Sequence, residues 1–303
     1  MRGRVLLMGS VLAAIMVAIL TTAALLLVEP NLSTAEAIRT GGLAGGAVIA
    51  LYALWLNDRR RRTDEARHEL ESDKAADERF ARAVELLGNE ADQVRVGALH
   101  ALVWLADSTP RYKQTVLDVL CAYLRRPFTH PSYGRSADEL DQASPDDSSD
   151  SSVADRERQV RLTAQRLITD LLPWGQNPDR RAYHLDLTGA SLEHFRLEGR
   201  RIGRLTARLT RFYGTTRLSG VHASKPALFT GAVFLGRVDL RDARFEGGIS
   251  FQGTAFFSEV DFKGALVSTF IDLNTTAPEW QTGTLAITEG TKVKGEAGRW
   301  ALA

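Results

Sequence analysis

The order of apolar and polar residues divides this 303-residue chain into segments of different character. Residues 5–28 contain no charged side chain, and a helix of that length would be about 36 Å long, more than the ~30 Å hydrocarbon core of a bilayer. The alternative is a cleaved signal peptide, whose apolar region would be shorter, about 7–15 residues. A second apolar run, residues 41–56, ends near Tyr52 and Trp55, which suit the headgroup level. We therefore predict a two-helix transmembrane anchor over residues 1–57.

The basic residues predict how this anchor is oriented. Arg2 and Arg4 precede the first apolar run, and four arginines at positions 59–62 follow the second. The connecting residues 29–40 contain a single basic residue, Arg39. Because short cytoplasmic segments are enriched in basic residues, we expect a multi-pass protein with both termini in the cytoplasm. The spacings Gly41-x-x-x-Gly45 and Gly42-x-x-x-Gly46 would either let membrane helices approach closely, which would also allow oligomerisation, or mark a frayed helix start.

Helical periodicity continues over residues 58–127, which we predict to be a cytoplasmic helical section. After a stretch that mixes both charge signs, apolar residues recur at helical spacing in three stripes. The stripes are Phe80, Val84 and Leu87; Val96, Leu99, Val103 and Ala106; and Tyr112, Val116, Leu120 and Leu124. Two amphipathic helices joined by a tight turn cannot bury their apolar faces alone. We expect them to pack on the preceding helix, on a later one, or on a second copy.

The next stretch, residues 128–155, is rich in serine and aspartate and has almost no apolar residue. Such a composition cannot offset the entropy lost on ordering, so we predict a disordered acidic linker. Apolar residues at helical spacing resume at Val160, and we predict a helix over residues 156–174 that leads into the C-terminal part.

From residue 234 onward, two apolar columns recur at every eleventh position. One column holds Phe234, Phe245 and Phe256, and the other holds Leu240, Phe251, Phe262 and Leu273. Upstream the spacing is five, through Leu187, Leu192, Leu197, Ile202 and Phe212, and it continues less regularly through Leu218, Ala223 and Leu228. Neither a helix face nor a flat strand repeats at every fifth position or at alternating spacings of five and six. A coil with four short sides does, if each side turns one large residue inward and the coils stack about 4.8 Å apart.

These columns predict the interior of a repeat domain. The expected core residues are Leu187, Leu192, Leu197, Ile202, Phe212, Phe234, Leu240, Phe245, Phe251, Phe256, Phe262 and Leu273. Solenoids need a cover over their open end, so we expect Trp280 and the tail, residues 276–303, to form a C-terminal cap.

Two five-residue segments carry a resemblance to a known family. Leu185-Asp186-Leu187-Thr188-Gly189 and the following segment, positions 190–194, resemble pentapeptide repeats, in which the third residue is Leu or Phe. The resemblance implies a right-handed, four-sided β-helix over residues 183–275, with about four coils. The order of spans, helices and repeats also resembles bacterial membrane-anchored pentapeptide-repeat proteins, which implies the bacterial inner membrane. The predicted fold class is therefore multidomain, with a transmembrane hairpin and helical section followed by a β-helix.

Charge and candidate chemistry limit the classes of function. The formal net charge of +1 provides no long-range attraction to nucleic acid. The single cysteine, Cys121, excludes an intramolecular disulfide. None of the six histidines pairs with another His or with Cys at metal-ligand spacing, and no phosphate loop or nucleophile elbow is present. We expect no enzyme activity, no metal and no cofactor.

The leading hypothesis is therefore a membrane-anchored scaffold or interaction module for a protein partner. A cluster of arginines is either a solvated face or a candidate docking surface for an acidic protein or for lipid headgroups. The cluster consists of Arg196, Arg200, Arg201, Arg204, Arg208 and Arg211. One alternative, implied by the resemblance, is a DNA mimic that binds a type II topoisomerase, which would need an acidic surface. Another alternative is an accessory subunit of a membrane channel or transporter, although neither span carries a charge inside it.

Overall fold

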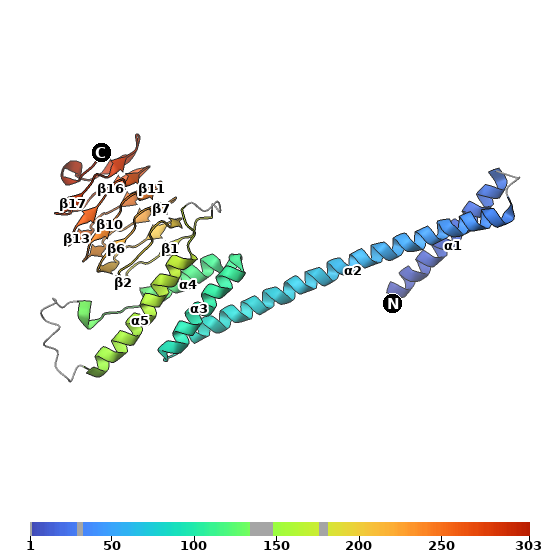
Figure 1. Cartoon of the computed structure of the whole chain (residues 1–303), viewed down its shortest axis with the longest axis horizontal. Coiled ribbons are helices and arrows are strands. Elements are labelled where there is room, and N and C mark those ends of the chain that lie inside the picture. The colour runs from blue at the N-terminus through green and yellow to red at the C-terminus, as the bar shows by residue number, and fades with distance from the viewer. Residues whose placement is uncertain (1, 29–32, 134–147, 176–180) are drawn as a thin grey trace. The chain divides into compact units, whose positions relative to one another are not determined.

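The computed structural model describes residues 2–28, 33–133, 148–175 and 181–303 (Figure 1). The chain divides into two compact units, Met1–Ala75 and Ala76–Ala303.

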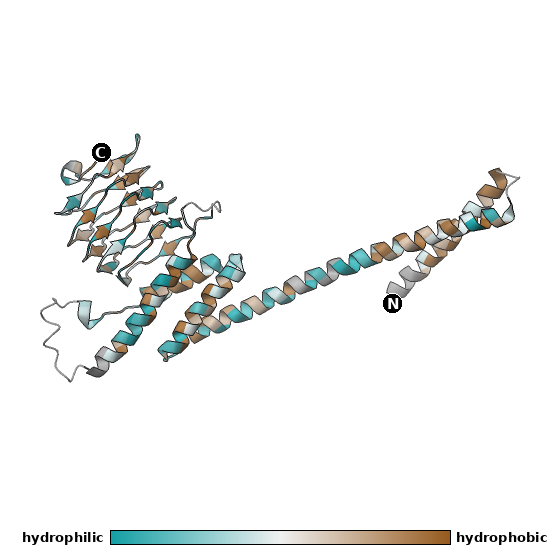
Figure 2. Cartoon of the chain, in the orientation of Figure 1, coloured by the Kyte–Doolittle hydropathy of each residue, from teal (hydrophilic) through white to brown (hydrophobic). Residues whose placement is uncertain are grey.

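The first unit is an apolar helical pair, α1 (Arg2–Val28) and the first part of α2 (Thr34–Leu86). Each helix contains a stretch, Met8–Val28 and Thr34–Arg61, that is long and apolar enough to cross a membrane (Figure 2). Close packing depends on Gly45, because a Cβ atom there would lie 2.9 Å from the Ala14 carbonyl oxygen and 3.1 Å from the Ala18 Cβ atom. A Cβ atom at Gly46 would meet nothing within 4 Å among the described residues.

Helix α2 does not end where the sequence analysis placed the end of the anchor. The chain does not break at the predicted boundary between residues 57 and 58, because α2 runs continuously from Thr34 to Leu86, and the boundary between anchor and cytoplasmic section stays a prediction. No Gly or Pro occurs between residues 57 and 79 to stop the helix. Charged pairs one turn apart, such as Arg67 and Glu71 with 3.0 Å between Nε and Oε1, suit a solvated helix.

The second unit begins with a helical layer. It contains α3 (Asp92–Ser108), the 3₁₀ turn η1 (Pro110–Tyr112), α4 (Lys113–Arg125) and α5 (Ser148–Leu171). Leu99, Leu102 and Leu120 are fully buried between these helices. Both α3 and α4 pack against α5, so the apolar stripes of the helical hairpin are covered by a later helix of the same chain.

The predicted linker is ordered at both of its ends. The 3₁₀ turn η2 (Pro131–Tyr133) and the start of α5 at Ser148 fall within residues 128–155, and the prediction of disorder is wrong there. The Tyr133 ring stacks on that of Tyr213, with centroids 3.7 Å apart. This tertiary contact supplies burial that the composition of the segment does not reveal. Residues 134–147 lie outside the described residues.

The C-terminal part of the second unit consists of short strands. They are β1 (Leu185–Asp186), β2 (Ser191–Glu193), β3 (Arg201–Ile202), β4 (Leu205–Thr206), β5 (Arg211–Tyr213), β6 (Thr216–Arg217), β7 (His222–Ala223), β8 (Ala227–Leu228), β9 (Val233–Phe234), β10 (Val238–Asp239), β11 (Arg244–Phe245), β12 (Ile249–Ser250), β13 (Ala255–Phe256), β14 (Val260–Asp261), β15 (Leu266–Val267), β16 (Phe270–Asp272), β17 (Gln281–Thr282), β18 (Ala286–Ile287) and β19 (Lys292–Lys294).

These strands form four parallel sheets, one on each side of a solenoid. Face 1 contains β1, β4, β8, β12, β16 and β19, and face 2 contains β2, β5, β9 and β13. Face 3 contains β6, β10, β14 and β17, and face 4 contains β3, β7, β11, β15 and β18. Six strands on face 1 correspond to about five turns. The predicted four-sided coil is confirmed, with one turn more than expected because the tail continues it.

The change from a spacing of five to a repeat at every eleventh position is a change in coil length. Leu185 pairs with Leu205, twenty positions later, but Leu205 pairs with Ala227, twenty-two positions later. The shorter turn fits four sides of five, and the longer turn fits two sides of five and two of six. The parallel register is kept through β12 and β16, where Ile249 pairs with Ile271.

The interior of the solenoid is a set of stacked columns. Phe212, Phe234 and Phe256 stack with centroid separations of 4.5 and 5.3 Å. Of the twelve predicted core residues, eleven are at most 1% exposed, and Phe256 is partly buried near the C-terminal end. Phe195 and Phe229, whose side chains are each 1% exposed, complete the aromatic core.

Leu228 was assigned to the interior wrongly. It is only partly buried, and the neighbouring Phe229 fills the position instead. Phe229 lies one longer turn before Phe251, and the two rings stack with centroids 5.8 Å apart. The longer turn shifts the inward position by one place along the chain, which a plain spacing of five does not reproduce.

Candidate interaction surfaces

Helix α5 covers the N-terminal edge of the solenoid and satisfies its backbone groups. The Thr169 hydroxyl donates to the Arg196 carbonyl oxygen at 2.6 Å, and the Gln165 amide oxygen accepts from the Glu193 backbone N–H at 3.2 Å. Beyond the helix, the Pro173 carbonyl accepts from the Arg201 N–H at 2.8 Å. An exposed strand edge could pair with other chains, and these contacts cover that edge at the N-terminal end of the solenoid.

Ion pairs fix the helical layer to the first coil. Arg158 donates to both carboxylate oxygens of Glu193, at 2.6 and 2.5 Å. These hydrogen bonds hold the pKa of the Glu193 carboxyl below its usual value, against the opposing effect of burial. Arg125 on α4 donates to the Asp186 carboxylate on β1. The helices and the first coil therefore share one continuous apolar core with a charged margin.

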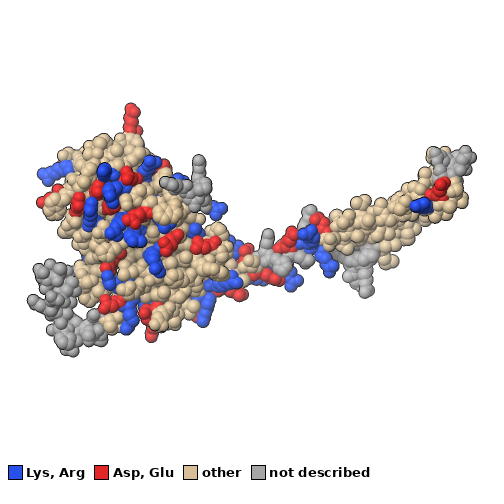
Figure 3. Space-filling view, in the orientation of Figure 1, with Lys and Arg blue, Asp and Glu red and all other residues tan. Residues whose placement is uncertain are grey.

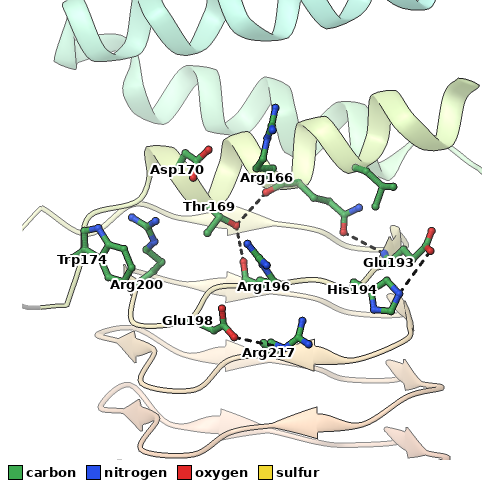
Figure 4. Close-up of a pocket in the computed structure, with 12 residues that line it drawn as sticks. Arg166, Thr169, Asp170, Trp174, Glu193, His194, Arg196, Glu198, Arg200 and Arg217 are labelled. Atoms are coloured by element: carbon green, nitrogen blue, oxygen red, sulfur yellow. Dashed lines mark hydrogen bonds and ion pairs between the residues drawn. The ribbon is translucent and has the colours of Figure 1, made fainter.

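A cleft of about 350 Å³ lies between α5 and the first coils near face 3 (Figure 4). Leu162 and Thr169 of α5 form one wall, and His194, Arg196 and Arg217 belong to the solenoid. Two of its carboxylates are already paired: the Glu198 carboxylate lies 3.7 Å from the Arg217 guanidinium, and Glu193 is held by Arg158.

Trp174 stands at the mouth of this cleft beside Arg200, as Figure 4 shows. The Arg200 guanidinium carbon lies 3.9 Å from the centroid of the Trp174 ring, and the Arg200 Nη1 atom donates to the Leu172 carbonyl oxygen at 2.9 Å. The Trp174 side chain is nonetheless 58% exposed. An aromatic ring held against a fixed guanidinium, yet open to solvent, is typical of binding hot spots.

The six arginines predicted to form a docking surface do not form one surface. Arg196 bridges to Arg217 on face 3, Arg201 belongs to β3 on face 4, and Arg211 belongs to β5 on face 2. Arg204 and Arg208 flank β4 on face 1. Residues about five apart in the sequence lie on successive sides of the coil, so a linear cluster becomes a ring around it. Arg200 and Arg201 are partly buried and the other four are exposed.

Charges farther along the solenoid neutralise one another. On face 3, Asp239 pairs in register with Asp261, and the Arg241 guanidinium donates to both Asp239 carboxylate oxygens at 2.9 and 2.8 Å. These hydrogen bonds from Arg241 hold the pKa of Asp239 below its usual value. Figure 3 shows acidic and basic side chains interspersed over the visible side of the solenoid.

The described residues offer little reactive chemistry. Within them, no group of three His, Cys, Asp or Glu side chains could hold a metal ion. Cys121 is buried in α4, and burial raises the pKa of its thiol to about 12, so the thiolate is scarce at neutral pH.

Two site features were missed by the sequence analysis. Trp174 follows Pro173 at the end of a helix, and nothing in its local pattern indicates an exposed position on Arg200. Tyr133 lies in a segment of disorder-prone composition, and its partner Tyr213 points outward from β5. Each depends on a contact between segments that are far apart in the sequence.

The sheets and registers described above define a parallel, four-sided β-solenoid preceded by helices. Residues 207–255 and 229–269 match the family model for pentapeptide repeats (9 copies). The C-terminal region therefore contains pentapeptide repeats, and the resemblance to that family is confirmed over residues 207–269. No curated protein and no solved structure matches the chain.

Proposed function

We propose that this protein is a non-enzymatic interaction module that two transmembrane helices hold at the cytoplasmic face of the bacterial inner membrane. The observation that carries the proposal is Trp174, which is 58% exposed and fixed against Arg200 at the mouth of the α5 cleft. A rigid aromatic residue contributes apolar contact area with little loss of side-chain entropy.

The covered N-terminal end of the solenoid supports binding beside it. Helices α4 and α5 cover the first coil, so that edge is not free to add strands from another chain. A protein partner would bind next to this edge, where Trp174 and the α5 cleft provide both apolar and charged groups.

The apolar helices support the membrane location. The stretches Met8–Val28 and Thr34–Arg61 are sufficiently long, and the arginines at positions 59–62 would remain on the cytoplasmic side. Anchoring confines the module to two dimensions and thereby raises its effective concentration for a membrane-associated partner.

Proximity labelling of the full chain in its native host tests the interaction. A labelling enzyme fused after Ala303 would mark neighbouring proteins for the native chain, for Trp174→Ala and for Trp280→Ala. Trp280 is a matched control, because it is 56% exposed but lies near the opposite end of the solenoid. We expect the native partner to be lost from the Trp174→Ala sample and retained with Trp280→Ala. Identical labelling in all three samples would refute docking at Trp174.

Cysteine accessibility tests the topology independently. In a Cys121→Ala background, a single cysteine introduced at Ser33 should react with an impermeant maleimide from outside the cell. A cysteine introduced at exposed Glu246 should react only after the membrane is permeabilised. Reaction at both positions in intact cells would contradict the proposed orientation.

A further inference from the structure

A second cleft, of about 590 Å³, lies between α4 and the first coils on face 1. Asp118 of α4 forms part of one wall, and Asp186 of β1 and Thr206 of β4 belong to the solenoid. Arg204, Arg208 and Lys225 also line it, and all three side chains are exposed. The cleft is distinct from that beside Trp174.

The carboxylates in this cleft are already engaged, whereas the cations are not. Asp186 accepts from Arg125 and, at 2.6 Å, from the Thr188 hydroxyl, and Asp118 accepts from Gln114 at 2.8 Å. Among the described residues, no carboxylate lies within ion-pair distance of the three lining cations, Arg204, Arg208 and Lys225. With Arg125 included, the cations around the cleft exceed the carboxylates by two charges.

The walls of the cleft are held in place by hydrogen bonds. The Gln114 side chain of α4 both donates to the His184 carbonyl oxygen and accepts from the His184 N–H, each at 2.9 Å. The Arg204 backbone N–H donates to His184 Nδ1 at 2.8 Å, which leaves Nε2 as the N–H donor of the neutral ring. These bonds hold the backbone beneath the cleft and the His184 ring in place before a ligand enters, so only the cationic side chains have to be ordered on binding.

We propose that this cleft binds the phosphoryl dianion of a small phosphate monoester. A phosphoryl group carries nearly two negative charges and three acceptor oxygens at neutral pH, which matches the two surplus charges and the guanidinium and ammonium donors. A carboxylate carries only one charge and two acceptor oxygens. The volume falls in the range of small-molecule sites, about 300–1,000 Å³, and the cations surround a concave space instead of a flat surface. This inference does not depend on the protein partner proposed above.

Equilibrium dialysis tests this with the full chain in nanodiscs of phosphatidylcholine at constant ionic strength. The probes are glycerol 3-phosphate and inorganic phosphate, with glycerol and acetate as controls. We expect saturable binding of both phosphoryl probes and of neither control. Arg204→Gln and Arg208→Gln should each weaken binding at least tenfold. The matched variant Arg211→Gln, an exposed arginine on face 2, should change it less than twofold.

Three results would overturn the proposal. One is the absence of saturable binding of glycerol 3-phosphate up to about 10 mM. Another is an equal loss of affinity in Arg211→Gln, which would indicate a general charge effect. The third is binding only to phosphatidic acid included in the nanodisc, which would assign the cleft to a lipid headgroup. Unchanged thermal unfolding of the variants would show that they are folded, so that a loss of binding reports on the cleft.

Discussion

Trp300 stacks on Phe251, with ring centroids 5.6 Å apart and ring planes 17° apart. It thereby continues the column of Phe229 and Phe251 and covers the C-terminal end of the core, where its own side chain is 6% exposed. Trp280, which the sequence analysis assigned to the cap, is 56% exposed and covers nothing comparable. The tail forms a fifth turn through β17, β18 and β19 before Trp300 closes it.

Replacing Trp300 should therefore destabilise the last coil. Removal of a buried Trp side chain destabilises a core by roughly 3–5 kcal/mol. Because a solenoid is stabilised mainly by contacts between neighbouring turns, the effect of Trp300→Ala should be concentrated in residues 276–303. Hydrogen exchange should be faster there and unchanged in the first coils. Trp280→Ala should leave the exchange unaltered, and equal effects of the two variants would contradict a cap at Trp300.

The inward orientation of the columns predicts a contrast between neighbouring positions on one coil. Phe251 is 1% exposed, whereas Glu246 is exposed and pairs with His222 at 2.7 Å between Oε1 and Nε2. Phe251→Asp would place a carboxylate in an apolar column and should unfold the coil at room temperature. Glu246→Lys loses only a surface pair, a change of less than about 1 kcal/mol. Circular dichroism during heating distinguishes them, and matching melting temperatures would refute the stacked core.

A strained corner predicts a stabilising change. One corner of the coil is occupied by Gly189, Leu209 and Gly231 in three successive turns. All three residues have a positive φ, and the value at Leu209 is +55°. A left-handed backbone is unfavourable for Leu by roughly 1–2 kcal/mol, and Asn tolerates it better. Leu209 is 67% exposed, so little packing would be lost.

Leu209→Asn should therefore raise the free energy of unfolding by about 0.5–1 kcal/mol, measured by urea denaturation. Leu235→Asn is the matched control, because Leu235 is 40% exposed but does not have a positive φ. Stabilisation by the control and not by Leu209→Asn would rule out strain as the cause.

Acid should weaken the attachment of α5 to the first coil. Because hydrogen bonds from Arg158 hold the folded-state pKa of Glu193 below its unfolded value, this carboxyl stabilises the fold at neutral pH. That contribution is lost as pH falls from the unfolded value, about 4.3, through the lower folded one. Glu193→Gln should lower stability at pH 7 by about 1–3 kcal/mol.

The difference between the native chain and Glu193→Gln should shrink when melting is measured at about pH 3. Glu198→Gln serves as the control, because Glu198 is more exposed and lies 3.7 Å from Arg217. A difference that stays constant from pH 7 to pH 3 would show that the Glu193 pair does not carry this acid sensitivity.

The two glycine spacings in α2 lead us to expect different effects of substitution at Gly45 and at Gly46. Gly45→Leu would collide with Ala14 and Ala18 of α1, whereas a Cβ atom added at Gly46 would meet nothing within 4 Å in the described residues. Only Gly45→Leu should separate the helices. This can be measured in detergent as reduced cross-linking of cysteines introduced at positions 22 and 37, because the Thr22 hydroxyl oxygen lies 3.4 Å from the Ala37 carbonyl oxygen. Equal cross-linking in both variants would show that Gly45 is not needed for close approach.

The sequence by itself determined which side chains occupy the solenoid interior and that the coil has four sides. An apolar residue at every fifth position, or at alternating spacings of five and six, is incompatible with a helix or a flat strand, and burial of large side chains then fixes the winding. Local spacing encodes this information because each turn contacts only its neighbours. The same logic failed at Leu228, where a longer turn follows a shorter one and moves Phe229 inward.

Only the tertiary structure decided how the pieces are joined and which surfaces remain open. The pairing of α5 with the first strands, the stacking of Tyr133 on Tyr213 and the closure by Trp300 all join segments far apart in the chain. The arginines from 196 to 211 are close together in the sequence but occupy different sides of the coil. Four of them thus belong to two separate clefts, Arg196 and Arg200 beside α5, and Arg204 and Arg208 beside α4. Their surroundings depend on helices whose docking the repeat pattern does not encode.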